Sequence, residues 1–287
     1  MKIIPSNEPF TSNGFLKLKD KNFLDKQRVA GKVVARSLSM LESLVKEKTN
    51  LSTLELSRLV DDFIVSQNCI PTFKNYKGFP AAVCISVNNA LVHGIPNDYK
   101  LQDGDVVKFD LGATFENTIA DSALTCIYGE PKKQEHVKLI KACEEALMKG
   151  IAAIKVGNNL GCIGNAIYKS AKGNGYSVVT AYGGHGICNH SDGSGMPHAP
   201  PFVCNRANPN ERIRIQPGLV VAIEPMLLPY DVSTTTLDDG WTVVTKEVGT
   251  HQEHSIFVHD DCVEILTWRE NETYLKSNKL YFNQIAI

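Results

Sequence analysis

The sequence predicts an α+β fold in which an antiparallel sheet carries helices on one face. Two helical patterns precede a group of strand-like segments, and this order then occurs a second time. The two parts of this weak internal duplication cover residues 20–130 and 131–268. Because no Ser-, Gly- or Pro-rich tract and no block of charge separates them, we expect a single domain at residues 21–287, after a polar lead-in at residues 1–20.

Four segments have apolar residues at the spacing of an amphipathic helix. They cover residues 20–46, 52–65, 132–154 and 159–173. The second begins at Ser52, and Glu55 three positions later completes the pattern of a capping box.

The predicted strands are short apolar runs bounded by turn residues. They cover residues 82–88, 106–113, 118–127, 177–183, 219–224, 241–248, 252–259 and 262–268. The second and third flank a short turn at Glu116 and Asn117, which predicts a hairpin. A Gly- and Pro-rich loop is expected over residues 183–218.

Composition excludes several classes of function. The 287 residues carry a formal net charge of -1, so no overall field attracts the chain to nucleic acid or to an anionic membrane. No apolar run approaches the roughly 20 residues that span a bilayer, and residues 1–14 lack the apolar stretch of a secretory signal. The eight cysteines form no C-x-x-C pair. We therefore expect a cytoplasmic protein with reduced thiols.

Five side chains with metal-binding chemistry lie in otherwise apolar segments: Asp110, Asp121, His185, Glu224 and Glu253. Taken alone, each has an ordinary alternative as a turn, edge or solvated strand-end residue. Together they need a shared positive charge, because an unpaired buried carboxylate costs so much free energy that it protonates instead. An oxygen-rich set with one imidazole and no thiolate suits Mn(II), Fe(II), Co(II) or Zn(II), and two such cations would supply hydrolytic chemistry.

The positions of these five residues predict how they meet. Asp110 and Asp121 are eleven positions apart across the expected hairpin. If its turn lies near residues 115–116, the two aspartates face each other and can point to the same side of the sheet. Glu224 lies at a strand end, because a proline follows it, and Glu253 begins a strand. The glycines beside His185 predict close backbone approach and positive φ angles.

Motifs in order along the chain give it a specific resemblance to the type I methionine aminopeptidases. They are KQRVAGKVVA (26–35), NYKGFPAAVCISVNNALVHGIP (75–96), LQDGDVVKFDLGA (101–113), GGHGI (183–187), IQPGLVVAIEPM (215–226), DDGWTVVTK (238–246) and QEHSIFV (252–258). The resemblance implies the pseudo-twofold pita-bread fold, with helices on the outer face of the sheet. It also implies a metallopeptidase that removes the initiator methionine from nascent proteins when the second residue is small and uncharged.

The resemblance assigns Asp110, Asp121, His185, Glu224 and Glu253 as ligands of two divalent cations (Co, Mn, Fe or Zn). Asp121 and Glu253 would bridge both ions and Asp110 would bind one of them. His185 and Glu224 would complete the other. A bridging hydroxide would attack the carbonyl of the N-terminal methionine, with Glu224 as the general base, and the free α-amino group would coordinate one metal.

The resemblance also assigns residues to the substrate. His93 matches a histidine that contacts the substrate backbone near the scissile amide, although alone it would be an ordinary loop residue. Tyr76, Phe79, Cys84 and Trp241 match the wall of the methionine pocket, where apolar and aromatic groups suit a flexible thioether. Many relatives have Tyr in place of Phe79, and Cys84 also fits an ordinary core position.

The sequence departs from the family pattern after His185. The family's second catalytic histidine is expected seven positions later, where this chain has Asp192. We predict that His198, in the sequence HAPP, takes that role after an insertion at residues 188–197, and that it donates a hydrogen bond to the developing oxyanion. His190 is the rival for this role.

Two other functions are alternatives. A proline-directed peptidase of the same fold would share the ligands, but such relatives normally carry a large extra N-terminal domain. A non-catalytic binding module of the fold would have lost ligands, whereas all five are present here. The expected partners are the N-termini of nascent polypeptides, with transient ribosome contact as an option and with neither nucleic acid nor membrane. We expect a monomer.

Overall fold

The structure, a computed structural model, describes residues 18–187, 197–230, 233–272 and 280–282. Most of the lead-in predicted at residues 1–20 lies outside these residues. So do His190 and nearly all of the insertion at residues 188–197.

All four predicted helices are confirmed. They are α1 (Lys21–Lys46), α2 (Thr53–Ser66), α3 (Gln134–Ala152) and α4 (Gly161–Gly173), and a 3-10 turn, η1, covers Tyr76–Gly78. The predicted capping box begins α2, since the backbone N–H of Ser52 donates to Glu55 Oε2 at 2.7 Å and the N–H of Glu55 donates to Ser52 Oγ at 3.2 Å. None of the helices in the described part of the chain is long and apolar enough to cross a membrane.

The strands form four sheets, and the largest has the order β16-β15-β14-β9-β7-β8. In a second sheet, β4 pairs with β1, β2 and β5. All pairs are antiparallel, as predicted, except β15 with β16. The strands are β1 (Ile70–Pro71), β2 (Cys84–Val87), β3 (Ala90–Val92), β4 (Val106–Phe115), β5 (Thr118–Ile127), β6 (Ser177–Val178), β7 (Gly184–Gly186), β8 (Ala199–Val203), β9 (Val220–Ile223), β10 (Met226–Leu228), β11 (Thr235–Thr236), β12 (Val243–Val244), β13 (Thr250–His251), β14 (His254–Val258), β15 (Val263–Ile265) and β16 (Leu280–Phe282).

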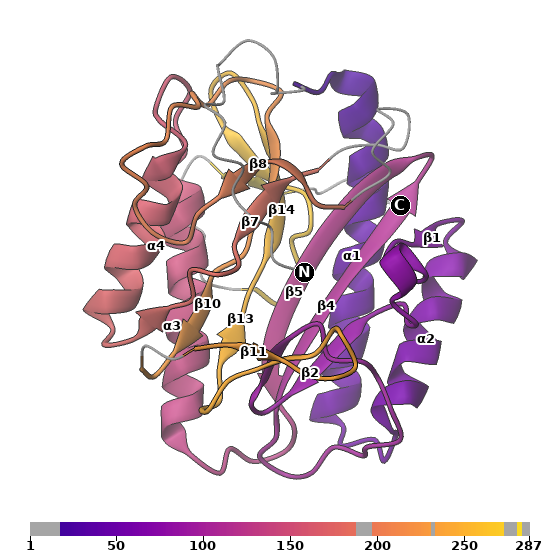
Figure 1. Cartoon of the computed structure of the whole chain (residues 1–287). Helices are drawn as coiled ribbons and strands as arrows, with labels where there is room; N and C mark the ends of the chain where they lie inside the picture. The colour runs from indigo at the N-terminus through magenta and orange to yellow at the C-terminus, as the bar shows by residue number, and fades with distance from the viewer. Residues whose placement is uncertain (1–17, 188–196, 231–232, 273–279, 283–287) are drawn as a thin grey trace.

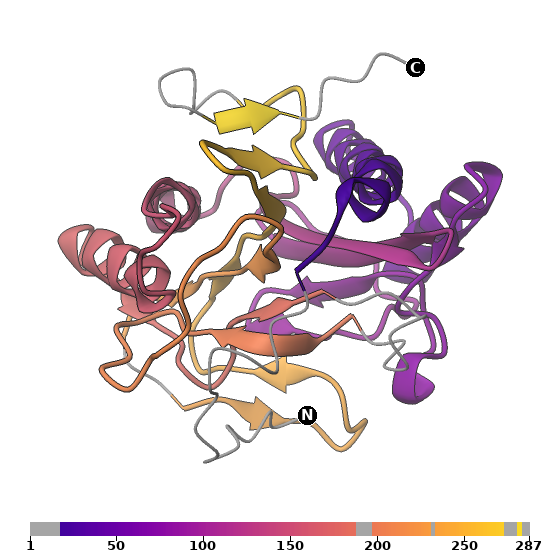
Figure 2. The ribbon, with the colours of Figure 1, turned by 90° about the horizontal axis from the view of Figure 1, so that it is seen from above.

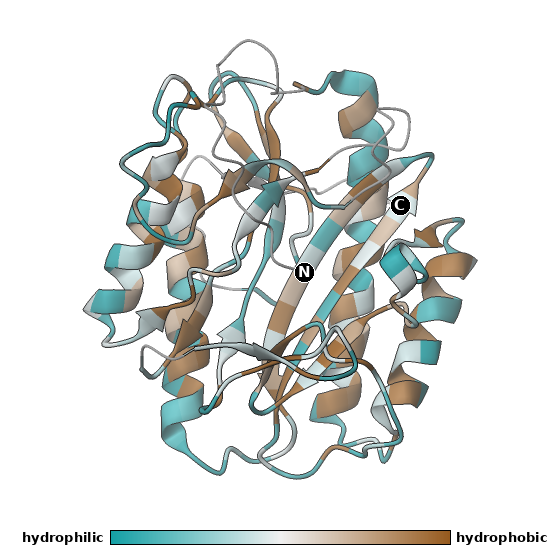
Figure 3. Cartoon of the chain, in the orientation of Figure 1, coloured by the Kyte–Doolittle hydropathy of each residue, from teal (hydrophilic) through white to brown (hydrophobic). Residues whose placement is uncertain are grey.

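The molecule has two halves, each with a helix pair beside its strands (Figures 1 and 2). In the first half, α1 and α2 bury apolar side chains with β4 and β5 in one core. In the second, α3 and α4 form another core with β9 and β14. Hydrophilic stretches on β5 and β14 lie between these apolar regions (Figure 3). This arrangement places polar side chains where the two halves meet.

Several strand predictions need correction. The predicted loop at residues 183–218 contains β7 and β8, and β8 tolerates its two prolines because it is the edge strand of its sheet. The strands predicted at residues 177–183 and 241–248 each shorten to two residues, in β6 and β12. The short strands β1, β3, β10, β11 and β13 were not predicted, because two or three residues carry no usable alternation.

Candidate metal centre

The five predicted ligands converge from both halves of the molecule. Asp110 lies on β4, Asp121 on β5 and His185 on β7, while Glu224 follows β9 and Glu253 precedes β14. Nε2 of His185 lies 3.6 Å from Oε1 of Glu224 and 4.0 Å from both Asp121 Oδ2 and Glu253 Oε1. The side chains of Asp121, His185 and Glu253 are only 2–3% exposed. Three acidic groups, those of Asp121, Glu224 and Glu253, therefore lie around one imidazole in a nearly dry site.

The hairpin aligns the two aspartates on one face, but not directly opposite each other. Its turn consists of Glu116 and Asn117, so Asp121 pairs with Gly112. Asp110 lies two residues before Gly112 on β4. The side chains of Asp110 and Asp121 therefore point to the same side of the sheet. The prediction of a shared side holds, whereas the prediction that the aspartates face each other is wrong by two residues of register.

The ring of His185 is oriented by the backbone of the next residue, Gly186. Nδ1 lies 3.1 Å from the carbonyl oxygen of Gly186, and the tautomer that donates this hydrogen bond leaves a lone pair on Nε2, the atom that faces the carboxylates. A Cβ added at Gly184 would lie 2.3 Å from the Ala222 carbonyl oxygen, and one at Gly186 would lie 2.1 Å from that of Pro200. The close approach of neighbouring backbone therefore explains why these two positions are glycine. Their φ angles are not positive, so the prediction of positive φ beside His185 is wrong.

The donor set fits two divalent cations. One group of possible ligand atoms, all within 4.8 Å of one another, comes from Asp110, Asp121 and Glu253, and another comes from His185, Glu224 and Glu253. Asp110 Oδ1, Asp121 Oδ1 and Glu253 Oε1 are buried and have no hydrogen-bond partner among the described residues. Buried carboxylate oxygens without protein partners are what cations would satisfy. Glu253 belongs to both groups, which is the arrangement that a bridging ligand requires.

Without cations, the carboxyl groups resist ionisation. Burial raises the pKa of Asp110 to about 7 and that of Glu224 to about 7. Burial and the neighbouring carboxylates hold the pKa values of Asp121 and Glu253 well above their usual range. The cluster is therefore electrostatically incomplete by itself, because its charged form needs compensating positive charge.

Two further histidines lie beside the cluster. The ring centroid of His198 is 4.5 Å from that of His185, and His198 can also join Asp121 and His185 around an ion. His93 has a φ angle of 58°, in the left-handed region that non-glycine residues rarely adopt. Burial lowers the pKa of His93 to about 4 and that of His198 well below its usual range. Both imidazoles are thus neutral at neutral pH.

An apolar cluster adjoins the acidic groups. It contains three of the predicted pocket residues, since Phe79 and Cys84 are buried in it and Trp241 packs against it. The rings of Phe79 and Trp241 meet edge to face at 5.1 Å, and Cys84 is the cross-strand neighbour of Asp110. Tyr76 stands apart from this cluster, with its ring 5.9 Å from His198. The structure thus brings an apolar wall directly to strand β4, which carries the candidate ligand Asp110.

The sequence did not point to several neighbours of the site. Phe73 and Ile95 belong to the apolar cluster, and their motifs carry no signal beyond hydrophobicity. His251 lies with Nε2 3.3 Å from Glu224 Oε2. The position of this histidine, two residues before the candidate ligand Glu253, is the signal that would have found it.

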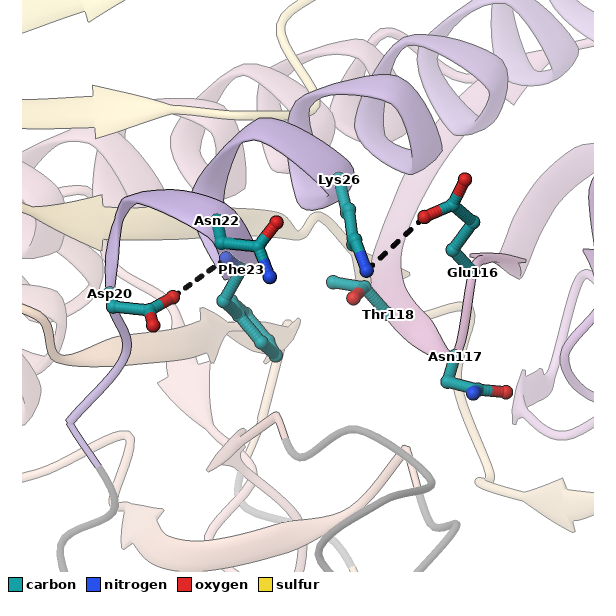
Figure 4. Close-up of a pocket in the computed structure, with 7 residues that line it drawn as sticks. All are labelled: Asp20, Asn22, Phe23, Lys26, Glu116, Asn117 and Thr118. Atoms are coloured by element: carbon teal, nitrogen blue, oxygen red, sulfur yellow. Dashed lines mark hydrogen bonds and ion pairs between the residues drawn. The ribbon is translucent and has the colours of Figure 1, made fainter.

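A separate hollow of about 260 Å³ lies at the start of α1 (Figure 4). Lys26 points across it toward Glu116, at 3.1 Å, and Asp20 caps the helix there. It is lined by Asp20, Asn22, Phe23, Lys26, Glu116, Asn117 and Thr118. None of the candidate ligands lines this hollow, so it is not part of the metal centre.

Comparison with known proteins identifies the family. The model of metallopeptidase family M24 matches residues 25–262. The methionine aminopeptidase of Mycoplasma capricolum is 39% identical over 255 residues, which are 88% of this chain and 98% of that protein. The crystal structure of methionine aminopeptidase from Rickettsia prowazekii superposes with a TM-score of 0.81 at 34% identity, covering 88% of this chain and 100% of that one.

A more distant match shows the fold alone. The prolidase from Pyrococcus furiosus superposes with a TM-score of 0.66 at 18% identity, and the match covers 88% of this chain but 66% of that one. The α+β pita-bread fold and the resemblance to methionine aminopeptidases are both confirmed. The chain belongs to metallopeptidase family M24.

Proposed function

We propose that the chain is a methionyl aminopeptidase that removes the initiator methionine from nascent proteins whose second residue is small and uncharged. The observation that supports this most directly is the pair of ligand groups that share Glu253, placed beside the apolar cluster of Phe79, Cys84 and Trp241. The ligand groups would hold two cations at the scissile amide. The apolar wall would accept the methionine side chain.

The residues of the chain divide the chemistry among them. Asp110, Asp121, His185, Glu224 and Glu253 would hold two divalent cations. When bound, these cations supply a water nucleophile at neutral pH and stabilise negative charge. Glu224, at the edge of the cluster, would accept a proton from the attacking water.

The neutral histidines would act on the substrate. His198, whose ring lies 4.5 Å from that of His185, would donate a hydrogen bond to the substrate carbonyl oxygen as it becomes negatively charged. His93 would contact the substrate backbone, and its ring lies 6.4 Å from that of Trp241, at the apolar wall. We further propose a cytoplasmic monomer of one catalytic domain over residues 21–287 that meets nascent chains directly.

A metal-dependent peptidase assay tests this function. Metal-free protein is supplied with Mn, Fe, Co or Zn and given Met-Ala-Ser, Met-Lys-Ser or Ala-Pro peptides. We expect cleavage of Met-Ala-Ser only, with Glu253→Gln as the inactive control. Preference for Ala-Pro would support the proline-directed peptidase, and inactivity with every metal would support a binding module. Titration of the metal-free protein with Mn²⁺ should give two bound ions per chain.

A further inference from the structure

The two halves of the molecule meet where β5 runs beside β14 (Figure 1). These strands do not form a regular ladder. Among the described residues, one backbone–backbone hydrogen bond crosses this seam, from the N–H of Glu253, just before β14, to the carbonyl of Ala123 on β5 at 2.9 Å. The remaining polar contacts described across this seam come from side-chain hydroxyls.

Two buried serines connect the halves in a reciprocal way. Ser255 Oγ accepts from the backbone N–H of Asp121 at 2.9 Å and donates to the carbonyl of the same residue at 2.6 Å. Ser122 Oγ donates to the carbonyl of Glu253 at 2.5 Å. Each serine is thus within two positions of one acidic residue and bonds to the backbone of the other. Both serines are 0% exposed, so water does not compete for these hydrogen bonds.

We propose that Ser122 and Ser255 are positioning residues that set the distance between the carboxylates of Asp121 and Glu253. This inference rests on the proposed two-metal function, in which both of these carboxylates would help to hold the cations. Two carboxylates that hold the same cations must keep one separation, yet Asp121 and Glu253 come from different halves of the molecule. One backbone hydrogen bond, from Glu253 to Ala123, joins them there, so the serine hydroxyls add the contacts nearest to the two carboxylates. The hydroxyls fix the backbone of each ligand and leave its side-chain oxygens free for the cations.

Ser122 has additional support from the C-terminal side of the second half. Nη1 of Arg269 lies 3.4 Å from Ser122 Oγ and donates to it. This donor directs the serine proton toward the carbonyl of Glu253, because the hydroxyl has one proton to donate. The hydrogen bond from Ser122 to Glu253 is therefore fixed in direction as well as buried.

Calorimetric titration of the metal-free full-length chain with Mn²⁺ tests the inference. Ser255→Ala should weaken Mn²⁺ binding by about tenfold or more, whereas Ser255→Thr, which keeps the hydroxyl, should remain within about threefold of the original protein. Ser37→Ala is the matched control, because Ser37 is 0% exposed and donates to Val33 at 2.9 Å within α1, in the outer helix layer. It should lower the Tm without changing Mn²⁺ affinity.

Unchanged Mn²⁺ affinity in Ser255→Ala would overturn the inference, even if its Tm falls as in Ser37→Ala. If Ser255→Ala does not fold, the same criterion applies to Ser122→Ala, which loses the hydrogen bond donated to Glu253 and the one accepted from Arg269. The original protein separates this test from that of the function. If it binds two Mn²⁺ ions and cleaves Met-Ala-Ser while the serine variants have the same Mn²⁺ affinity, only the proposed role of the serines fails. If it does not bind two ions, both proposals fail.

Discussion

Nε2 of His251 lies 3.3 Å from Oε2 of Glu224, while Oε1 of the same carboxylate faces Nε2 of His185 at 3.6 Å. Glu224 thereby lies between two imidazoles, of which only His185 is a predicted ligand. His251 is 1% exposed, and Thr125 fixes its backbone through hydrogen bonds of 3.0 and 2.6 Å to its N–H and its carbonyl. His251 is therefore fixed directly beside the carboxylate proposed as the base.

Replacing His251 by Phe should impair catalysis more than folding. The ring volume remains, but Oε2 of Glu224 loses its polar neighbour, so kcat/KM for Met-Ala-Ser should fall about 10- to 100-fold. Steady-state kinetics and thermal unfolding measure the two effects. His136→Ala, on α3, is the control for loss of a histidine remote from the cluster. A kcat/KM within twofold of the original value would show that His251 is ordinary core.

The stability of the metal-free protein should depend on Glu224 through pH. Burial raises the pKa of Glu224 from 4.5 to about 7. Below pH 4.5 the carboxyl group is protonated in both states; between pH 4.5 and 7 only the unfolded state ionises, so stability is lost as the pH rises. Glu224→Gln has no such loss and should gain about 1–3 kcal/mol relative to the original protein between pH 5 and 7.5.

Chelator-treated protein in denaturant titrations at the two pH values measures this difference. Saturating Mn²⁺ should reverse the order of stability, because only the original residue provides a charged ligand. A difference that stays constant with pH would contradict the proposed environment of Glu224.

His198 and His190 can be separated by mutation. His198→Ala should lower kcat/KM for Met-Ala-Ser by about 100- to 1,000-fold, because it removes a donor to the developing oxyanion. His190→Ala should leave kcat/KM nearly unchanged. The opposite outcome would assign the role to His190 and would overturn the predicted alignment of the insertion at residues 188–197.

Trp241→Ala should weaken recognition of methionine. Trp241 packs against the apolar cluster and meets Phe79 edge to face, so its loss opens the proposed pocket wall. We expect KM for Met-Ala-Ser to rise about tenfold, or about 1.4 kcal/mol of binding, with a smaller change in kcat. Tyr230→Ala, at an aromatic residue that is 65% exposed, should not alter KM. Equal KM values for the two variants would place Trp241 outside the pocket.

Arg269→Ala should destabilise the fold. Arg269 and Glu272 form a buried ion pair, and although burial opposes it, the charges of Arg269 and His254 hold the pKa of Glu272 to about 2. Removing the cation leaves a buried carboxylate, at a cost of about 3–5 kcal/mol at pH 7.

The same ion pair predicts that the free energy of unfolding decreases at acid pH. The contribution of Glu272 is present above its unfolded pKa of 4.5 and is lost as the pH falls toward 2. Urea unfolding across this range should show that loss in the original protein and a weaker one in Arg269→Ala. If the free energy of unfolding changes equally with pH in the two proteins, Glu272 keeps its low pKa without Arg269.

Local patterns in the sequence were sufficient for the helices, for the capping box at Ser52 and for the hairpin of β4 and β5. These features depend on residues a few positions apart, whose spacing is visible in the chain. The candidate ligands were indicated only as a set, because several acidic residues in apolar segments together need compensating charge.

Tertiary structure alone decided the relationships that build the site. The Ser122–Glu253 and Asp121–Ser255 hydrogen bonds join residues 131 and 134 positions apart, and the contact of Glu224 with His251 depends on how β9 and β13 are placed. The two-residue offset of the aspartates follows from the register of one hairpin. Such contacts depend on how the two halves pack together, and the short-range periodicity of the sequence does not predict this packing. The chain by itself therefore indicated which groups are candidate cation ligands, and the fold decided how those groups are placed.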